Sequence, residues 1–278
     1  MSEFSPEWLD LREPADRRAR SGDVANAVSA RFALRDEVSV LDLGSGTGSN
    51  LRATAPLLPN RQRWKLVDHD ASLHEVAKTR LAAWADAAEI SDDGLRLRKD
   101  GRDIDVTFTV AELASETNSL VDEPPNLVTA SAFFDLASED YIRALAKAVA
   151  ERRIAFYATL TYNGQRRWTP HRPADNQMAS AFHRHQLRDK GLGLAVGPMA
   201  PAHLADQFRL NGYSVIEDDS NWRLDRNDRM LIEELVRGHA VAVSEVGGVD
   251  AKTIVDWINV SRSGVAIGHT DTFAAPAS

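Results

Sequence analysis

Residues 38–50 read Val-Ser-Val-Leu-Asp-Leu-Gly-Ser-Gly-Thr-Gly-Ser-Asn, and this stretch decides the fold class. Its first half is apolar and typical of a buried strand, whereas its second half is a turn containing Gly44, Gly46 and Gly48. Glycines at such a turn let bare backbone N–H groups and a helix N-terminus approach a ligand closely. In a parallel sheet the turn lies at the carboxyl edge of the strand, where α/β folds bind ligands. We therefore expect a nucleotide-type cofactor at this turn.

Outward from this turn, strand-type and helix-type stretches alternate along nearly the whole chain, a pattern that predicts a parallel α/β sheet. Seven strands are expected, enough for a Rossmann-like doubly wound sheet, at residues 37–43, 63–68, 104–110, 126–131, 154–160, 213–217 and 263–273. Apolar residues at three- and four-residue spacing predict helices at residues 49–58, 72–88, 139–151 and 202–210, and a long helical region at residues 227–262.

Several segments lie outside this alternation. Residues 1–35 are expected to form an N-terminal helical cap on a domain formed by residues 36–278. Residues 95–102 alternate in polarity and end in Asp-Gly, which predicts an inserted hairpin. The insertion at residues 165–201 is too long for a simple connection, so we expect a lid that sets substrate specificity.

Composition narrows the function. The 278-residue chain has no cysteine, which excludes disulfides, thiolate metal sites, iron–sulfur clusters and a cysteine nucleophile. Its net charge of −8 argues against a nucleic-acid partner. No apolar run approaches the roughly 20 residues of a membrane helix, and the acidic start is unlike a signal peptide. We expect a cytoplasmic protein that acts on a small molecule, without a membrane partner.

The glycine spacing separates two cofactor classes. Dinucleotide-binding enzymes require G-x-G-x-x-G, but this chain has G-x-G-x-G with Asp42 two residues ahead of the first glycine. That pattern resembles the first motif of class I S-adenosylmethionine-dependent methyltransferases. The resemblance implies S-adenosylmethionine as cofactor and a mostly parallel sheet whose last strand is antiparallel. It places cofactor contacts on the motif residues Asp42, Gly44, Ser45, Gly46, Thr47 and Asn50.

The resemblance extends to the ends of the next strands. Asp68 stands about 20 residues beyond the glycines, where a carboxylate accepts the hydroxyls of a ribose, with His69 beside it and Asp70 as the competing choice. Contacts to the adenine are implied for the stretch after the third strand, Ala111, Glu112 and Leu113. The end of the fourth strand would face the sulfonium through Ser131, Phe133 and Phe134.

Three polar side chains are candidates to orient or deprotonate an acceptor. Asp135 follows the aromatic pair and could alternatively cap the next helix. Tyr162 lies just past the fifth strand, in a Tyr-Asn-Gly sequence that is also an ordinary turn. His185 lies in the insertion; with His183 two residues away on a helix, the pair would point to different faces, and no metal site is expected.

The expected activity is methyl transfer to a small-molecule acceptor. Cytosine C5 methylation needs a cysteine, and the Asn/Asp-Pro-Pro-aromatic motif of base amino-methylation is absent where the chain reads Ser131-Ala132-Phe133-Phe134. The stretches 8–16 and 185–191 resemble a bacterial branch of the family. Two alternatives stay open: a non-methylating reaction of the same cofactor, and a regulatory protein that binds the cofactor without catalysis.

Overall fold

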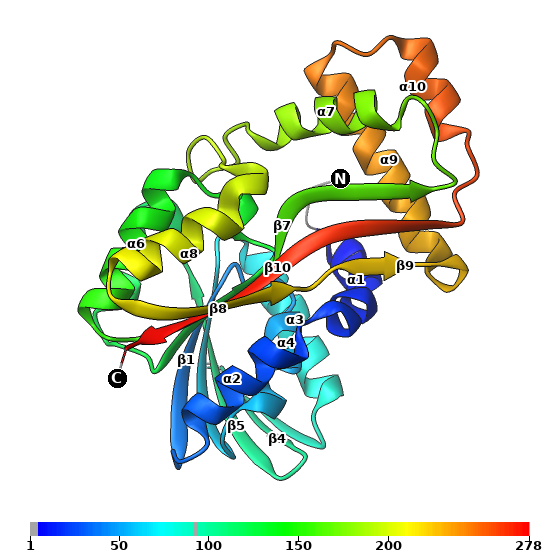
Figure 1. The fold of residues 1–278 in the computed structure, drawn as a ribbon. Helices are drawn as coiled ribbons and strands as arrows, with labels where there is room; N and C mark the ends of the chain where they lie inside the picture. Colours follow the sequence, from blue (N-terminus) through cyan, green and yellow to red (C-terminus); the bar gives the residue numbers. More distant parts are fainter. Residues whose placement is uncertain (1–4, 92–93, 278) are drawn as a thin grey trace.

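A single sheet of ten strands organises the chain, which the computed structural model describes at residues 5–91 and 94–277 (Figure 1). The order in the sheet is β3-β4-β5-β2-β1-β6-β7-β10-β8, and β9 pairs with β10. The strands are β1 (Glu37–Leu43), β2 (Arg61–Asp68), β3 (Ala87–Ser91), β4 (Gly94–Lys99), β5 (Arg102–Val110), β6 (Leu127–Ser131), β7 (Ala155–Thr169), β8 (Tyr213–Asp219), β9 (Trp222–Leu224) and β10 (Gly264–Pro276).

The seven expected strands are confirmed as β5-β2-β1-β6-β7-β10-β8 within this sheet. β1 pairs in parallel with β2 and β6, and the parallel set continues to β5 and β7. β10, the last strand, is antiparallel to both β7 and β8, as the resemblance implied. The strand order reverses at β1, so the glycine turn after β1 lies at the switch point where such sheets bind ligands.

Three further strands bring the total to ten rather than seven. The expected hairpin is β4–β5, which turns at Asp100 and Gly101, both with positive φ. The helix expected at residues 72–88 ends at Trp84, and residues 87–91 instead form β3 against β4. Alanine-rich composition favours a helix there, but pairing with an open sheet edge decides the conformation. β9 covers three residues, too few to show a period.

Helices cover both faces of the sheet (Figure 1). α6 and α8 lie over one face, where Leu145 and Phe208 join a core with Phe156. α2, α3 and α4 cover the other, where Leu51 and Leu81 are fully buried. The helices are α1 (Pro6–Ala19), α2 (Gly22–Phe32), α3 (Ser49–Thr54), α4 (Ala71–Trp84), α5 (Leu113–Leu120), α6 (Glu139–Glu151), α7 (Asp175–Gln186), α8 (Ala200–Leu210), α9 (Arg229–Val246) and α10 (Ala251–Ile258).

An upper layer stands beyond the carboxyl edge of the parallel strands. β7 pairs with β6 only through Thr159 and then continues to Thr169, paired with the start of β10 (Figure 1). The segment expected as an insertion from residue 165 therefore begins as strand, and α7 follows it. α7, α9 and α10 pack on this ribbon around a third apolar core. Because β7 runs parallel to β1, the layer rises from the edge that carries the glycine turn.

The long helical region expected at residues 227–262 consists of two helices. α9 ends at Val246 and α10 starts at Ala251, with Gly247 and Gly248 between them in left-handed conformations. Glycine adopts positive φ without steric cost, so this pair ends α9. Among the residues described, no helix is both long and apolar enough to cross a membrane.

Candidate functional site

The glycine turn after β1 needs its glycines for steric reasons. Gly44, Gly46 and Gly48 have φ values of +63°, +51° and +77°, in the left-handed region. A Cβ on Gly44 would stand 2.7 Å from Cδ2 of Phe133, closer than real Cβ contacts come. Gly48 is the N-cap of α3, so the turn presents backbone groups and a helix start in one place.

Beneath the turn, a hydrogen-bond chain fixes its base. Asp42 is fully buried, and its Oδ1 accepts from Asn50 Nδ2 at 2.6 Å. Asn50 Nδ2 also donates to Thr129 Oγ1 at 3.2 Å, and Asn50 Oδ1 accepts from Arg20 at 2.8 Å. Burial raises the pKa of Asp42 to about 7, although the Asn50 hydrogen bond and the charge of Arg20 oppose the shift. Asp42 and Asn50 thus support the turn from below.

Asp68, at the end of β2, lies directly against the turn. Its Oδ2 accepts from the Gly46 N–H at 2.9 Å, and its Oδ1 accepts from the Asp70 N–H at 3.2 Å. His69 Nδ1 is 3.1 Å from Asp68 Oδ1, with an exposed ring. The Asp70 carboxylate is turned away, because it caps α4 by accepting from the Ser72 N–H at 2.8 Å. Of the two competing acids, the structure brings Asp68 to the glycines.

Two hydroxyls of the turn are buried without a partner. Ser45 Oγ and Thr47 Oγ1 have no hydrogen bond within the described residues. α1 covers them from outside: a Cβ on Gly46 would lie 3.2 Å from Leu9, and Arg52 joins Glu13 of α1 to the Thr47 carbonyl. A buried polar atom without a partner is costly, so these hydroxyls are the atoms that a polar ligand would satisfy.

The expected adenine contacts follow β5. Ala111 and Leu113 are buried, and the Ala111 N–H donates to the Asp68 carbonyl at 3.1 Å. Glu112 is exposed; its N–H donates to Glu116 at 2.9 Å at the start of α5. This arrangement places Ala111 beside Asp68, whereas the side chain of Glu112 faces solvent.

The side chains of the two phenylalanines after β6 lie in different surroundings. Phe133 lies against Gly44 and meets Phe134 edge-on, with centroids 5.1 Å apart. Phe134 is instead buried in the sheet core on Phe156, so only Phe133 of the pair faces the turn. Ser131 ends β6 half-buried, beside Thr159 of β7.

Tyr162 and Asp135 lie near one another at the base of the upper layer. Burial raises the pKa of Tyr162, and the charge of nearby Asp135 raises it further, although Arg166 opposes the shift. The Tyr162 hydroxyl is 3.0 Å from His183 Nε2 on α7. His185 does not join this group: its Nε2 lies 3.0 Å from Glu245 on α9. Residues two apart on a helix point about 200° apart, so only one can face β7.

Arg166, which the sequence analysis did not single out, lies beside Tyr162 on the same face of β7. Its Nη1 is 2.5 Å from His239 Nδ1, and its guanidinium lies 4.2 Å from the centre of the Phe182 ring. His269 of β10 completes this side, 6.2 Å from the Tyr162 ring. Tyr162 and Arg166 are four residues apart, and residues an even number apart on a strand lie on the same face. The sequence could have indicated this only if β7 had been expected to continue past residue 160.

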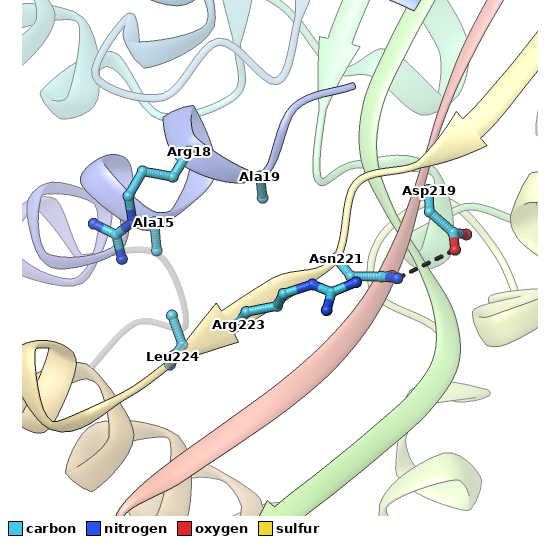
Figure 2. Close-up of a pocket in the computed structure, with 7 residues that line it drawn as sticks. All are labelled: Ala15, Arg18, Ala19, Asp219, Asn221, Arg223 and Leu224. Carbon is cyan, nitrogen blue, oxygen red and sulfur yellow. Dashed lines mark hydrogen bonds between the residues drawn. The ribbon is translucent and has the colours of Figure 1, made fainter. Parts of the chain in front are cut away.

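Two surface pockets lie outside this site. Each has a volume of about 230 Å³. In the first, Arg18 of α1 and Arg223 of β9 line a hollow between those two elements (Figure 2). The second lies at the opposite edge of the sheet, near the starts of β6 and β7. Over the described parts of the chain, no three His, Asp or Glu side chains are grouped as metal ligands.

Comparisons with known proteins bear on the fold. No protein-family model matches the sequence, and no curated protein matches it. Among solved structures, a cyclopropane-fatty-acyl-phospholipid synthase-like protein from Lactobacillus casei has a TM-score of 0.53 at 13% identity, covering 98% of this chain and 99% of its own. A protein from Bacillus halodurans, provisionally described as a methyltransferase, has 0.52 at 11%, covering 92% and 100%. The cyclopropane synthase from Mycobacterium tuberculosis has 0.51 at 11%, covering 98% and 95%.

The strand order and these similarities together show that the chain has the fold of the class I S-adenosylmethionine-dependent methyltransferases. At identities of 11–13% the likeness is one of fold. What the site binds and what reaction it performs must be argued from its own residues.

Proposed function

We propose that this protein binds S-adenosylmethionine at the glycine turn and transfers its methyl group to a small-molecule acceptor. The observation that carries the proposal is the arrangement of polar groups at the glycine turn. Three glycines have left-handed conformations, the Asp68 carboxylate accepts from the Gly46 N–H, and the Ser45 and Thr47 hydroxyls have no partner among the described residues. These groups fit the polar parts of the cofactor, and the turn admits its close approach.

Each part of the cofactor has a counterpart among these residues. A carboxylate has about four acceptor positions, so Asp68 can accept both ribose hydroxyls beyond the bonds it already makes. Ala111 and Leu113 supply apolar contact for the adenine, with Glu112 at its margin. The Phe133 ring against Gly44 offers a π face to a sulfonium cation. When bound, S-adenosylmethionine supplies an electrophilic methyl group.

The chain's own contribution to methyl transfer is positioning and proton handling. Asp135 follows β6, and Tyr162 lies within β7 just past the last residue paired with β6, where both can orient an acceptor above the turn. Burial lowers the pKa of His183, so its ring is neutral and can take a proton through the Tyr162 hydroxyl. We therefore propose His183 for this role instead of the expected His185, because His183 is the one that contacts Tyr162.

A small molecule is favoured over a nucleic acid. The net charge of −8 opposes a phosphate backbone, and the cysteine needed for cytosine C5 methylation is missing. The upper layer of α7, α9 and α10 stands beside the acceptor-side residues and would enclose a compact substrate.

Isotope labelling tests the reaction. The protein is incubated with trideuteromethyl-labelled cofactor and a small-molecule extract of cells, and products are followed by mass spectrometry. We expect S-adenosylhomocysteine together with a product that gains one labelled methyl group. The Tyr162→Phe variant should slow this by about 10- to 100-fold while binding the cofactor normally.

Two results would contradict the proposal, each in favour of an alternative. Formation of 5′-methylthioadenosine without labelled product would indicate a non-methylating reaction on the aminoalkyl chain. Tight cofactor binding with no turnover over the whole extract would indicate a regulatory binding protein.

A further inference from the structure

The guanidinium of Arg166 is buried, and it has no counter-ion in the part of the chain that the structure describes. Its guanidinium is enclosed between β7, α7 and α9, where Nη1 donates to His239 Nδ1 at 2.5 Å and Nε is buried with no hydrogen-bond partner. No Asp or Glu in residues 5–91 and 94–277 lies within ion-pair distance of it. Guanidinium stays protonated even when burial lowers its pKa, so the charge persists. An unpaired charge removed from water carries a large free-energy cost.

The groups around Arg166 do not supply the missing charge. Burial lowers the pKa of His239 well below its usual value and that of His269 to about 3, so both rings are neutral. His183 is neutral for the same reason, and the Tyr162 phenol keeps its proton because burial raises its pKa. Among the described residues, neutral groups stabilise the charge: His239 accepts the hydrogen bond from Nη1, the Tyr162 side chain also hydrogen-bonds to the guanidinium, and the rings of Phe182 and Tyr162 lie 4.2 Å and 5.7 Å from it.

Other buried arginines of this chain are paired differently. Arg262, 1% exposed and in the same upper layer, has Asp175 at 2.8 Å. Arg52, 5% exposed, has Glu13 at 2.5 Å. Arg166 differs from these two arginines, because its guanidinium has no carboxylate partner among the residues that the structure describes.

We propose that Arg166 holds the carboxylate of the acceptor, so that the substrate is a small monocarboxylic acid with an aromatic or otherwise apolar body. The inference rests on the methyl transfer proposed above and deepens it by naming the substrate class. A single guanidinium neutralises one negative charge, whereas a phosphate dianion would leave an excess charge among neutral imidazoles. Carboxylates bind arginine side-on through Nε and one Nη, and Nε of Arg166 has no hydrogen-bond partner among the described residues.

The surroundings fit the rest of such a substrate. Tyr162, Phe182 and Trp222 provide aromatic surface on the acceptor side, and Trp222 packs on His269 with ring centroids 5.2 Å apart. Tyr162 neighbours both Arg166 and Asp135. An acid anchored at Arg166 can therefore extend along Tyr162 toward the ends of β6 and the glycine turn.

The test compares carboxylates with uncharged analogues on the intact protein. Thermal unfolding is measured with sodium formate, sodium benzoate, benzamide and sodium chloride at equal ionic strength. The variants are Arg166→Met, Arg166→Lys and, as matched control, Arg167→Met, which removes the same charge from the exposed neighbouring residue. Formate is included because it is small enough for any cavity that admits a carboxylate.

We expect formate or benzoate, but not benzamide or chloride, to raise the unfolding temperature of the wild type and of Arg167→Met. Arg166→Met should weaken carboxylate binding at least about tenfold and, without ligand, should be no less stable than Arg167→Met, since it removes an uncompensated buried charge. Affinity for S-adenosylhomocysteine should stay within about twofold in every variant.

Three results would overturn the inference. One is a wild type that formate and benzoate do not stabilise, and another is equal stabilisation of Arg166→Met. The third is a ligand-free Arg166→Met that unfolds many degrees below Arg167→Met while Arg166→Lys does not, because Arg166 would then be a structural cation held by Phe182 and His239. Failure of the wild type to bind S-adenosylhomocysteine is a separate readout that removes the proposed function instead.

Discussion

Gly44 carries the steric constraint that joins the glycine turn to Phe133. Replacing Gly44 by Ala puts a Cβ 2.7 Å from the Phe133 ring at a φ of +63°. We expect Gly44→Ala to lower the free energy of unfolding by about 1–3 kcal/mol and to weaken cofactor binding. The control is Gly238→Ala within α9, where a Cβ meets nothing within 4 Å and where helix propensity favours alanine by roughly 0.5–1 kcal/mol. If urea denaturation shows the same change in unfolding free energy for Gly44→Ala and Gly238→Ala, the steric explanation is contradicted.

Asp42 makes stability depend on pH in a defined direction. Its folded-state pKa of about 7 lies above the unfolded value of 3.8, so the folded protein holds a proton that the unfolded chain has lost between those values. The stabilisation that comes from this proton is therefore fully present at low pH and is lost as the pH rises to about 7. Relative to wild type, Asp42→Asn should gain about 3 kcal/mol in free energy of unfolding between pH 5 and pH 8, because the pH passes through two pKa units at roughly 1.4 kcal/mol each.

Denaturant titrations at those two pH values measure this difference. The control is Asp105→Asn, which changes an exposed carboxylate on β5. Its free energy of unfolding should differ from that of wild type by nearly the same amount at both pH values. If the difference in unfolding free energy between Asp42→Asn and wild type is also the same at both pH values, burial does not hold the Asp42 carboxyl protonated.

At the scale of elements, the upper layer depends on one buried ion pair. Arg262, just before β10, pairs with Asp175 at the start of α7, and Asp175 also accepts from the indole of Trp257 on α10 at 2.7 Å. Arg262→Ala leaves that carboxylate buried without its cation, which should cost about 3–5 kcal/mol. Arg167→Ala, exposed on the same ribbon, should change stability by less than about 0.5 kcal/mol. Similar unfolding midpoints for the two variants would contradict this account of the layer.

Some strands could be predicted from the sequence, and others could not. β1 and β6 are short, mostly apolar runs, whereas β2 and β5 alternate polar and apolar residues. Amphipathic helices lie between them, so these four strands and the glycine turn can be predicted from the sequence pattern. β3 lies exposed at an edge, and β9 has three residues, so neither carries a period. The extension of β7 beyond residue 160 depends on pairing with β10, about 100 residues away, which no local pattern encodes.

For the site, the residues near the turn were more predictable than those on the acceptor side. Asp68 stands at a fixed spacing from a recognisable motif, and the structure places its carboxylate against Gly46; its ribose role stays a prediction. The choice between His183 and His185 depends on how α7 is rotated against β7 and α9, and that rotation is set by long-range packing. Arg166 was missed for a related reason, because its isolation from carboxylates is a property of the folded layer.

On the scale of the whole molecule, two layers meet at one edge. The sheet brings the glycine turn and Asp68 to the carboxyl ends of its strands, and the ribbon of β7 and β10 carries Tyr162 and Arg166 beyond the same edge. α1 covers the turn through Leu9 and through the Glu13–Arg52 ion pair. A ligand at the turn should therefore slow amide hydrogen exchange in α1 as well as in α3. Unchanged exchange in α1 on saturation with S-adenosylhomocysteine would contradict this role of the helix.

The central claim is that the glycine turn and Asp68 bind S-adenosylmethionine. Calorimetric titration with S-adenosylmethionine and S-adenosylhomocysteine tests it most directly, using wild type, Asp68→Ala and Asp70→Ala, with NADH as the control ligand. We predict micromolar binding of the first two ligands and none of NADH, with Asp68→Ala weaker by at least about tenfold and Asp70→Ala close to wild type, since Asp70 only caps α4. Folded wild type that binds neither ligand, or Asp68→Ala that binds as tightly as wild type, would contradict the account.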